Sequence, residues 1–149
     1  MLENHIDIEN IVFIGLQPRG IFLSDRLVEE IKKELPGRKI LYGKLDITFY
    51  RDDVRKELHK ANQTDILFSI EGKNVVLIDD VLYTGRTIRS ALDALLGFGR
   101  PAKVELCVLI DRRFSRQFPI QPDYTGKAID SIVTQKVKVE WTNDEVVIY

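Results

Sequence analysis

The sequence predicts an α/β protein with a mainly parallel, twisted sheet flanked by helices. Two observations carry this prediction: short apolar runs rich in β-branched residues, and segments between them with helical periodicity. Strands that alternate with helices join through right-handed crossovers, which place the strands parallel and cover both faces of the sheet. In such a sheet, ligands bind at the carboxyl ends of the strands, so the turns that follow the strands are candidate sites.

The first half of the chain supplies a strand, a helix and a second strand. The run IVFIG at 11–15 is almost wholly apolar and predicts a buried strand. Leucine and isoleucine recur every four residues over 21–35, which predicts a helix that the following proline and glycine end. The segment KILYGKLDITFY at 39–50 alternates apolar and polar residues, as a strand does, and DILFSI at 65–70 is a further candidate strand.

The second half continues the alternation and ends in a hairpin. Val75–Ile78 is short, apolar and mostly β-branched, which is the pattern of a central parallel strand. Apolar residues at helical spacing over 87–96 predict a helix, and KVELCVLI at 103–110 predicts another buried strand. The tail predicts a β-hairpin around a turn at Thr142–Glu145.

Composition sets limits on the function. The chain has 149 residues, the size of one ordinary domain, and we expect a single domain over 1–149. Its 22 Lys and Arg residues nearly balance 23 Asp and Glu residues, so net charge gives no reason to expect binding to nucleic acid or to a membrane. No apolar run approaches the roughly 18 residues of a membrane span. The single cysteine, Cys107, lies in an apolar run, which favours a buried thiol in a reducing cytoplasm.

The stretch VVLIDDVLYTGRT at 75–87 carries the strongest functional signal. Its second part, Tyr83–Thr87, lies between a predicted strand and a predicted helix, where backbone N–H groups are unpaired and carry partial positive charge. Gly85 lets the backbone wrap closely around a ligand, while two threonines and Arg86 add hydroxyl donors and charge. These features predict a phosphate cup; an ordinary helix start with a threonine cap is the alternative.

Two carboxylates, Asp79 and Asp80, precede this cup. Acids beside an anion site would repel the anion unless the ligand also offers hydroxyl groups or a cation. A ribose 5-phosphate meets this requirement, with its phosphate in the cup, its hydroxyls against the acids and a magnesium ion nearby. A P-loop ATPase also has an acidic strand end, but no Gly-Lys pair in this chain is followed by Ser or Thr. A receiver domain with a phosphoacceptor aspartate would need its acids on separate strands, whereas Asp79 and Asp80 are adjacent.

The same stretch resembles the phosphoribosyl-pyrophosphate motif of type I phosphoribosyltransferases. The form DDVLYTGRT resembles in particular the bifunctional pyrimidine operon attenuator/uracil phosphoribosyltransferase family (PyrR-type). Further segments match the family in the same order along the chain. GLQPRG matches the pyrophosphate loop, and DITFYRDD matches the strand that enters the catalytic loop. LIDRR matches the downstream strand end, and PDYTGK matches the hood region. The resemblance spans residues 11–127 and implies the type I fold, with a small hood that covers the base.

The resemblance implies a reaction in which a nitrogenous base displaces pyrophosphate from C1 of phosphoribosyl pyrophosphate, with Mg²⁺ as the cofactor. Asp79 and Asp80 would hold the ribose hydroxyls and reach the metal through water rather than directly. Arg19 would face the pyrophosphate, where it would stabilise the departing charge. The implied phosphate-binding residues are Tyr83, Thr84, Gly85, Arg86 and Thr87, with Gly20 allowing close approach of the backbone.

The segment Arg51–Lys60 would be a lid that keeps water away from the reacting sugar. Arg51 is the catalytic residue expected there, and Arg55 and Lys56 could also reach the leaving group. Without the resemblance, the polar segment 51–64 fits a solvated surface helix or a loop equally well.

The resemblance also bears on the base. Purine-specific relatives often carry an acid at the position of Tyr83, and its absence favours a pyrimidine, with uracil as the first choice and UMP as the product. The hood would lie around Asp123–Asp130. There the chain reads DYTGKAIDS (123–131), where the family commonly reads DY-GKNIPT. The base-binding residues would be Tyr124, Thr125, Gly126 and Lys127.

A second function stays open, which is regulation by binding messenger RNA of the pyrimidine operon with nucleotide as the effector and weak or no catalysis. It would use a basic face of a homodimer, and family members usually carry a longer opening helix where this chain has the acidic MLENHIDIEN. A catalytically weak sensor of ribose-phosphate ligands is a third alternative. Candidate residues for a basic face are Arg112, Arg113, Arg116, Lys127, Lys136 and Lys138.

Overall fold

The computed structural model describes residues 8–47 and 65–149. In chain order, the elements are η2 (Ile8–Asn10), β1 (Ile11–Gln17), α1 (Gly20–Glu34), β2 (Leu41–Asp46), β3 (Asn74–Leu82), α2 (Arg86–Leu95), η4 (Leu96–Phe98), β4 (Lys103–Arg113), β5 (Tyr124–Asp130), β6 (Val137–Glu140) and β7 (Glu145–Ile148).

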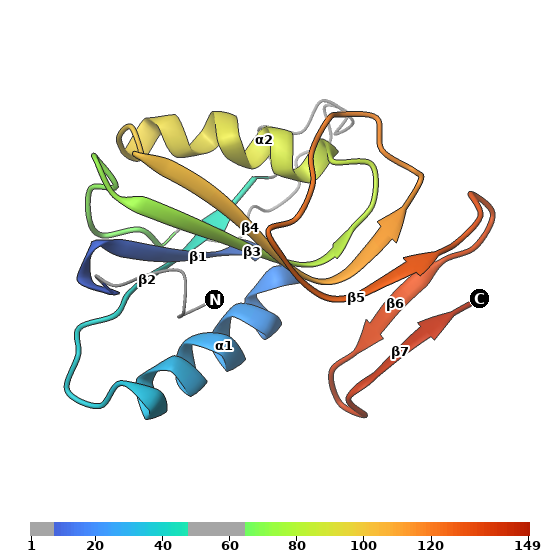
Figure 1. Cartoon of the computed structure of the whole chain (residues 1–149), viewed down its shortest axis with the longest axis horizontal. Helices are drawn as coiled ribbons and strands as arrows, with labels where there is room; N and C mark the ends of the chain where they lie inside the picture. Colours follow the sequence, from blue (N-terminus) through green and yellow to red (C-terminus); the bar gives the residue numbers. More distant parts are fainter. Residues whose placement is uncertain (1–7, 48–64) are drawn as a thin grey trace.

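Strands β1 to β5 form one parallel sheet in the order β2-β1-β3-β4-β5, while β6 and β7 form a separate antiparallel hairpin. Figure 1 shows α1 along one face of the sheet and α2 along the other. The predicted α/β class, its parallel sheet and its C-terminal hairpin are therefore confirmed. No helix in the described part of the chain is long and apolar enough to cross a membrane.

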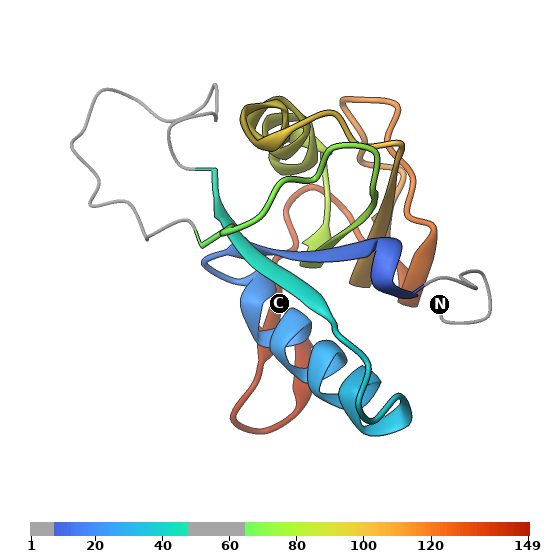
Figure 2. The ribbon, with the colours of Figure 1, turned by 90° about the vertical axis from the view of Figure 1, so that its left-hand side faces the viewer.

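The side chains of β1 alternate between two apolar layers, one on each face of the sheet. Val12 and Ile14 pack in the layer that contains Ala91 of α2, whereas Phe13 packs in the layer that contains Val28 of α1. Figure 2 shows the two helices on opposite sides of the sheet. Because both faces are covered, β1 is apolar from Ile11 to Ile14 and β3 from Val75 to Ile78, rather than at alternate positions.

The predicted strand at 65–70 is wrong. This segment makes only an isolated bridge, in which the backbones of Asp65 and Lys44 exchange hydrogen bonds of 2.9 and 2.8 Å. Its apolar residues pack individually: Ile66 and Ile70 enter the core, while Leu67 is 92% exposed. The short apolar run at 65–70 therefore predicted a strand, although its buried residues only anchor the connection that leads to β3.

The two strands that lead to the predicted site are longer than their apolar runs. Strand β3 continues past Ile78 to Leu82, and β4 continues past Ile110 to Arg113. The two strands stay paired over this extension, since Leu82 of β3 still pairs with Asp111 of β4. Polar side chains at the ends of the strands thus interrupt the hydrophobic pattern without ending the sheet.

The segment Asp123–Asp130, expected as a hood, is corrected to an edge strand of the main sheet. Strand β5 pairs with the lengthened β4 from Tyr124 opposite Cys107 to Asp130 opposite Arg113. The long β4 offers a free edge for this pairing, and Asp123 starts it by accepting a 2.8 Å hydrogen bond from the backbone of Leu106. Among the described elements, the β6–β7 hairpin is the strand pair that stands apart from the sheet.

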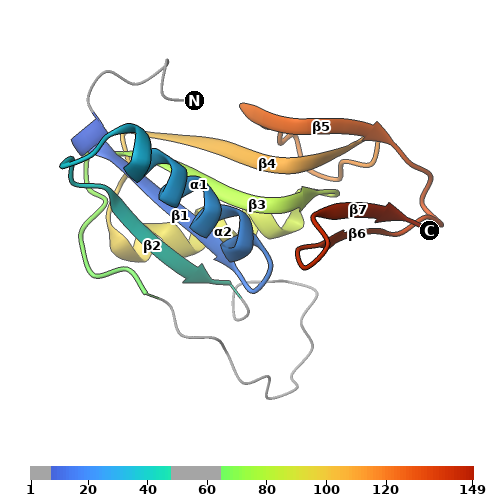
Figure 3. The same cartoon turned by 90° about the horizontal axis from the view of Figure 1, so that it is seen from below.

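The first turns of α1 hold this hairpin in place. The rings of Phe22 and Trp141 stack with centroids 6.0 Å apart. The guanidinium of Arg26 lies 4.9 Å from the centre of the Trp141 ring, and it donates hydrogen bonds to the Trp141 carbonyl (3.1 Å) and to the Asp144 carboxylate (2.7 Å). Figure 3 shows the hairpin beyond the carboxyl ends of β3 and β4, beside the start of α1.

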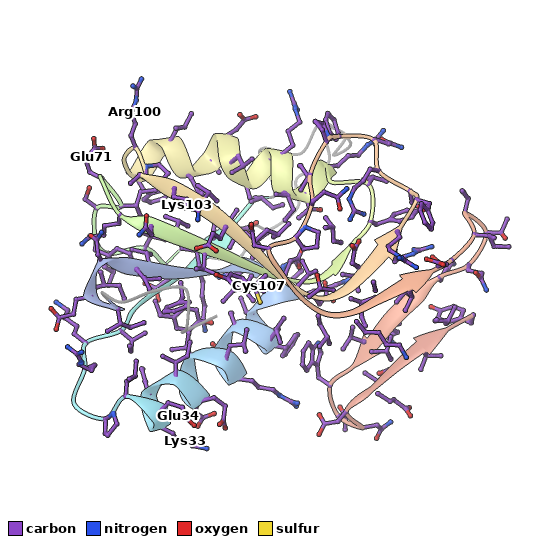
Figure 4. The ribbon with its side chains drawn as sticks, viewed as in Figure 1. Lys33, Glu34, Glu71, Arg100, Lys103 and Cys107 are labelled. Carbon is purple, nitrogen blue, oxygen red and sulfur yellow. The ribbon has the colours of Figure 1, made fainter. Side chains whose placement is uncertain are left out.

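The single cysteine provides a test of burial within the sheet. Cys107 lies in the middle of the molecule (Figure 4) and is 7% exposed, and burial raises the pKa of its thiol from 9.0 to about 11. Between these values the unfolded thiol has lost its proton while the folded thiol keeps it. The free energy of unfolding should therefore fall as the pH rises from 9.0 towards about 11.

This decrease can be measured by urea unfolding of the protein and of Cys107→Ala across that pH range. The part of the decrease that comes from the thiol should be missing in the variant. Identical pH profiles for the two proteins, or rapid reaction of the native thiol with a thiol reagent near neutral pH, would contradict the assignment.

Candidate active site

The candidate site lies where β1 and β3 separate at their carboxyl ends. The two strands pair from Ile11 opposite Asn74 to Gly15 opposite Ile78, and β3 then continues alone on this side. The chain runs from β1 to the edge strand β2 and then returns to β3 on the other side of β1. A reversal of this kind opens a crevice at the edge of a parallel sheet, which is where ligands bind in such folds.

The turn after β1 approaches β3 closely because residue 20 is glycine. A Cβ atom on Gly20 would lie 2.6 Å from the carbonyl oxygen of Ile78 and 3.0 Å from the Cα of Asp79. The preceding residue, Arg19, is the N-cap of α1 and is exposed. The close contact therefore brings the arginine and the N-terminus of α1 to the same part of the sheet edge as the acids.

Asp79 and Asp80 are each 8% exposed. An Oδ1 atom of Asp79 accepts a 2.8 Å hydrogen bond from the backbone N–H of Asp80, and Oδ1 of Asp80 accepts one of 2.7 Å from Val81. Burial, and then repulsion from the Asp80 carboxylate, raise the pKa of Asp79 well above its usual range, against the smaller opposing effect of Arg19. A cation or hydroxyl donors at this point would favour the charged form of the pair.

The predicted phosphate cup is a cavity of about 320 Å³ at the start of α2, and all five residues Tyr83–Thr87 line it. Gly85 is the N-cap of this helix, with a φ of 91° that favours glycine. The Thr84 hydroxyl accepts a 3.3 Å hydrogen bond from the backbone N–H of Arg86. The structure thus brings these residues together at a helix N-terminus, and phosphate binding there stays a prediction.

The segment 117–120, to which the sequence analysis gave no place in the site, forms an outer wall of the cup. The backbone N–H groups of Gln117 and Phe118 donate to the carbonyl of Thr84 at 2.8 and 3.3 Å. The side-chain oxygen of Gln117 accepts a 2.7 Å hydrogen bond from Nε of Arg86, and Gln117 lines the cavity. Gln117 therefore fixes the direction of the arginine at the mouth of the cup.

Arg116 fastens this wall from behind. Its guanidinium forms an ion pair with Asp111 and donates a 2.8 Å hydrogen bond to the carbonyl of Tyr83, the first residue of the cup. It also donates to the carbonyls of Arg112 (3.1 Å) and Ile120 (2.7 Å). The side chain of Arg116 is only 13% exposed, so its hydrogen bonds hold the loop inside the protein and its charge is not displayed on the surface.

Two further cavities adjoin the cup. A central cavity of about 450 Å³ shares Asp79 and Tyr83 with the cup and reaches Arg19. An outer cavity of about 560 Å³ shares Arg19 with the central cavity, as well as Asp80, and extends to Trp141 of the hairpin. The three cavities therefore follow one another along the sheet edge, from the start of α2 to the hairpin.

The four predicted base-binding residues do not line any of these cavities. Tyr124 donates its hydroxyl hydrogen to Glu105 at 2.5 Å, while Thr125, Gly126 and Lys127 lie exposed on the edge strand β5. Their role in base binding stays a prediction. The predicted lid Arg51–Lys60, with the catalytic Arg51, lies outside the described residues.

Arg112 and Val137 line both the central and the outer cavity, although the sequence analysis gave neither a place in the site. Arg112 and Gln117 follow the apolar run of β4 and so lie at the carboxyl edge of a parallel sheet, which was a usable signal. Val137 carried no such signal, since an apolar residue in a hairpin ordinarily indicates packing.

The paired acids fit one type of metal binding. In the described part of the chain, no group of three or more His, Cys, Asp or Glu side chains could hold a metal ion. Mg²⁺ commonly keeps several of its waters and binds through one or two carboxylates together with the phosphates of a substrate. Asp79 and Asp80 therefore suit a magnesium ion that arrives with a phosphorylated ligand.

The crevice between the carboxyl ends of β1 and β3, together with the cavities along it, places this molecule among the type I phosphoribosyltransferases. The chain belongs to the phosphoribosyl transferase domain family, whose sequence profile matches residues 1–143. Within the family it is of the PyrR type. It is 47% identical over 142 residues to the bifunctional protein PyrR of Elusimicrobium minutum (strain Pei191), covering 94% of this chain and 78% of that protein. It is 48% identical over 143 residues to bifunctional protein PyrR 1 of Lactiplantibacillus plantarum, covering 93% and 78%.

Solved structures support the fold independently. A hypoxanthine phosphoribosyltransferase from Staphylococcus aureus superposes with a TM-score of 0.60 at 23% identity, over 82% of this chain and 63% of that one. A hypoxanthine-guanine phosphoribosyltransferase from Bacillus anthracis gives a TM-score of 0.62 at 21% identity, over 86% and 71%. At these identities the likeness shows the fold alone, and this chain spans less than two thirds of the S. aureus protein.

Proposed function

We propose that the chain transfers ribose 5-phosphate from phosphoribosyl pyrophosphate to uracil, giving UMP and pyrophosphate. The observation that carries this proposal is the row of cavities at the sheet edge, in which a helix N-terminus, a pair of buried carboxylates and an arginine turn follow one another. Their order matches the order of groups in the sugar substrate, which are the 5-phosphate, the ribose hydroxyls and the pyrophosphate.

Each part of the substrate meets a suitable group of the chain. The 5-phosphate binds at the N-terminus of α2, where backbone N–H groups and the threonine hydroxyls of Tyr83–Thr87 donate to it. Asp79 and Asp80 accept hydrogen bonds from the ribose hydroxyls and favour the positive charge that grows on the sugar as its bond to pyrophosphate breaks. Arg19 stabilises the negative charge that grows on the leaving group.

Mg²⁺ is the proposed cofactor, bound with the substrate and reached by Asp79 and Asp80 through water. It would neutralise charge on the pyrophosphate. The proposed lid Arg51–Lys60 would exclude water, which competes with the base for the same sugar carbon.

Uracil is proposed because the chain has Tyr83 where purine-specific relatives often have an acid. Tyr124, Thr125, Gly126 and Lys127 remain the proposed base-binding residues from the family resemblance. The central and outer cavities offer a second place for the base, beside Val137 and Arg112. Asp80 lines both of these cavities.

RNA regulation is the second proposal, and it rests on the same PyrR-type resemblance. Of the six basic residues considered for an RNA-binding face, Arg112 and Arg116 turn into the interior. Arg113 pairs with Asp130 at 2.8 Å, and Lys138 pairs with Glu140 at 2.8 Å. These contacts reduce the charge available to RNA. A steep decrease of RNA affinity with salt would support this function, and no measurable binding at low salt would contradict it.

We further propose a single domain over 1–149, a homodimer or higher homo-oligomer, and a cytoplasmic location. The dimer rests on the family resemblance, and the location rests on the single buried cysteine. Equilibrium sedimentation would test the dimer.

The transfer reaction is tested by incubating the purified protein with phosphoribosyl pyrophosphate, magnesium and one base at a time. The bases are uracil, orotate, cytosine, hypoxanthine, guanine and adenine, and the measured product is pyrophosphate. Release with uracil alone is the expected result. Release with another base would keep the class of reaction and overturn the substrate, whereas no release with any base would overturn the enzymatic function.

A further inference from the structure

The second turn of α1 holds a fully buried polar side chain. Ser24 is 0% exposed and packs directly on Gly15 of β1. A Cβ atom on Gly15 would overlap the Ser24 hydroxyl and lie 2.8 Å from the Ser24 Cβ. Gly20, one helical turn earlier and on the same face of α1, makes the corresponding close approach to β3. The start of α1 therefore rests against two strands, at positions that exclude a Cβ atom on Gly15 and on Gly20.

A chain of hydrogen bonds joins the same part of α1 to a third strand. The hydroxyl oxygens of Ser24 and Tyr42 lie 2.5 Å apart, and Tyr42 donates to a carboxylate oxygen of Asp25 at 2.6 Å. Tyr42 belongs to the edge strand β2. Lys44, the next residue on the same face of β2, holds its ammonium group 3.4 Å from the Asp25 carboxylate. These contacts tie the second turn of α1 to the edge strand.

The hydrogens of the two hydroxyl groups have one arrangement that satisfies the charged acceptor. Each hydroxyl carries a single hydrogen, so when Tyr42 donates to Asp25, Ser24 donates to Tyr42. The 3.1 Å contact of the Ser24 hydroxyl with the Ile21 carbonyl is the alternative for the serine hydrogen. A hydrogen bond to an ionised acceptor is the stronger kind, which favours the first arrangement. Burial, and then the hydrogen bond to Asp25, raise the pKa of Tyr42 above its usual range, so the phenol keeps the proton that it donates.

This network lies directly behind the arginine turn of the site. Arg19 is the N-cap of α1 and immediately precedes Gly20. The close contacts at Gly15 and Gly20 limit how near the helix start can come to the sheet, but they do not prevent it from rotating or moving away. A hydrogen bond is directional, so the bond between Tyr42 and Ser24 restrains these remaining movements of the turn that carries Arg19.

We propose that Tyr42 is a positioning residue for Arg19 and that it acts through Ser24 and the first turns of α1. Tyr42 lines none of the three cavities described above, whereas Arg19 lines the central and the outer one. The assignment rests on the proposed function, in which Arg19 meets the pyrophosphate. The phosphate cup is built from the end of β3 and the start of α2, so it should not depend on Tyr42.

The test uses two ligands that probe the two ends of the site. Isothermal titration calorimetry with magnesium present measures the dissociation constants of pyrophosphate and of ribose 5-phosphate. Tyr42→Phe removes only the hydroxyl group and should weaken pyrophosphate binding by about threefold to tenfold, as expected for partial loss of a charge-assisted hydrogen bond. The affinity for ribose 5-phosphate should change by less than about twofold. An unchanged affinity for pyrophosphate, or an equal loss for both ligands, would overturn the proposal.

A double-mutant cycle tests whether Tyr42 acts through Arg19. Arg19→Met removes the guanidinium group and should itself weaken pyrophosphate binding. In that background, Tyr42→Phe should have little further effect, because the group that it positions is gone. If the two losses multiply instead, Tyr42 acts by another route and the proposal is wrong. It is also wrong if Arg19→Met alone binds pyrophosphate as tightly as the unmodified protein.

Two further variants separate positioning from general stability. Ser24→Ala removes the same hydrogen bond from the helix side and should reproduce the effect of Tyr42→Phe; it replaces that variant in the cycle if Tyr42→Phe does not fold. Ile31→Val removes one buried methyl group from the far half of α1, so it should lower the urea midpoint and leave both affinities unchanged. A loss of pyrophosphate affinity in Ile31→Val as large as that in Tyr42→Phe would show general loosening of the helix and would overturn the proposal.

Turnover is a separate readout that distinguishes this inference from the proposed reaction. If no base releases pyrophosphate while the binding results are as expected, the proposed reaction falls and the positioning role stands. If uracil releases pyrophosphate while Tyr42→Phe binds pyrophosphate normally, the reaction stands and the positioning role falls.

Discussion

Asp80→Asn should lower kcat/KM for pyrophosphate release by about a hundredfold to a thousandfold, which is the usual loss when one electrostatic contact to a transition state is removed. The asparagine keeps the shape of the side chain and an oxygen that can accept the 2.7 Å hydrogen bond from Val81. It removes the negative charge that would favour positive charge on the ribose. The fold should therefore persist while the reaction is lost.

Steady-state kinetics with varied phosphoribosyl pyrophosphate would measure this loss, and thermal unfolding would check the fold. Asp93→Asn is a matched control, because Asp93 is an exposed carboxylate on α2 outside the three cavities. It should leave kcat/KM unchanged. Full activity in Asp80→Asn, with the same unfolding temperature, would show that the paired acids are not the reacting site.

Gly20→Ala should lower the free energy of unfolding by about 3 kcal/mol, the upper part of the usual range for an added methyl group in a packed region. The new Cβ would meet two backbone atoms, the Ile78 oxygen at 2.6 Å and the Asp79 Cα at 3.0 Å, and neither can rotate away. Relief of this overlap requires α1 to move away from β3. Arg19 would move with the helix, so turnover should fall as well.

Urea unfolding would measure the loss of stability, and kinetics at a temperature where the variant is folded would measure the loss of turnover. Gly97→Ala makes the same chemical change where no heavy atom lies within 4 Å of the new Cβ. It should leave the free energy of unfolding within about 1 kcal/mol and turnover unchanged. Equal effects of the two substitutions would mean that α1 does not depend on its close approach to β3.

The fold was largely predictable because its central elements have strong periodic patterns. The stripe over 21–35 and the run Val75–Ile78 correspond to α1 and to the core of β3, since burial on both faces demands apolar residues at fixed spacing. The edges were not predictable in this way. Strand β5 is mostly exposed and therefore has no apolar pattern, so Tyr124–Asp130 was not recognised as part of the sheet.

The site was predictable where a single stretch of chain carries it. The acids and the cup are local in sequence, so VVLIDDVLYTGRT contains both. Arg112 and Gln117 line the cavities through contacts that depend on tertiary packing. The Arg112 guanidinium lies 4.0 Å from the centre of the Tyr83 ring, and Gln117 accepts a 2.7 Å hydrogen bond from Arg86. No spacing rule within the sequence encodes such contacts, because each joins residues about thirty positions apart.

The contact between α1 and the hairpin has a practical consequence, because it involves the only tryptophan of the chain. Trp141 lines the outer cavity, and its ring contacts both Phe22 and the guanidinium of Arg26. Its indole is therefore a built-in fluorophore at the wall of the site. Excitation of this one residue gives an emission signal free of other tryptophans, so ligand titrations and stopped-flow measurements of hairpin movement can be done without a label.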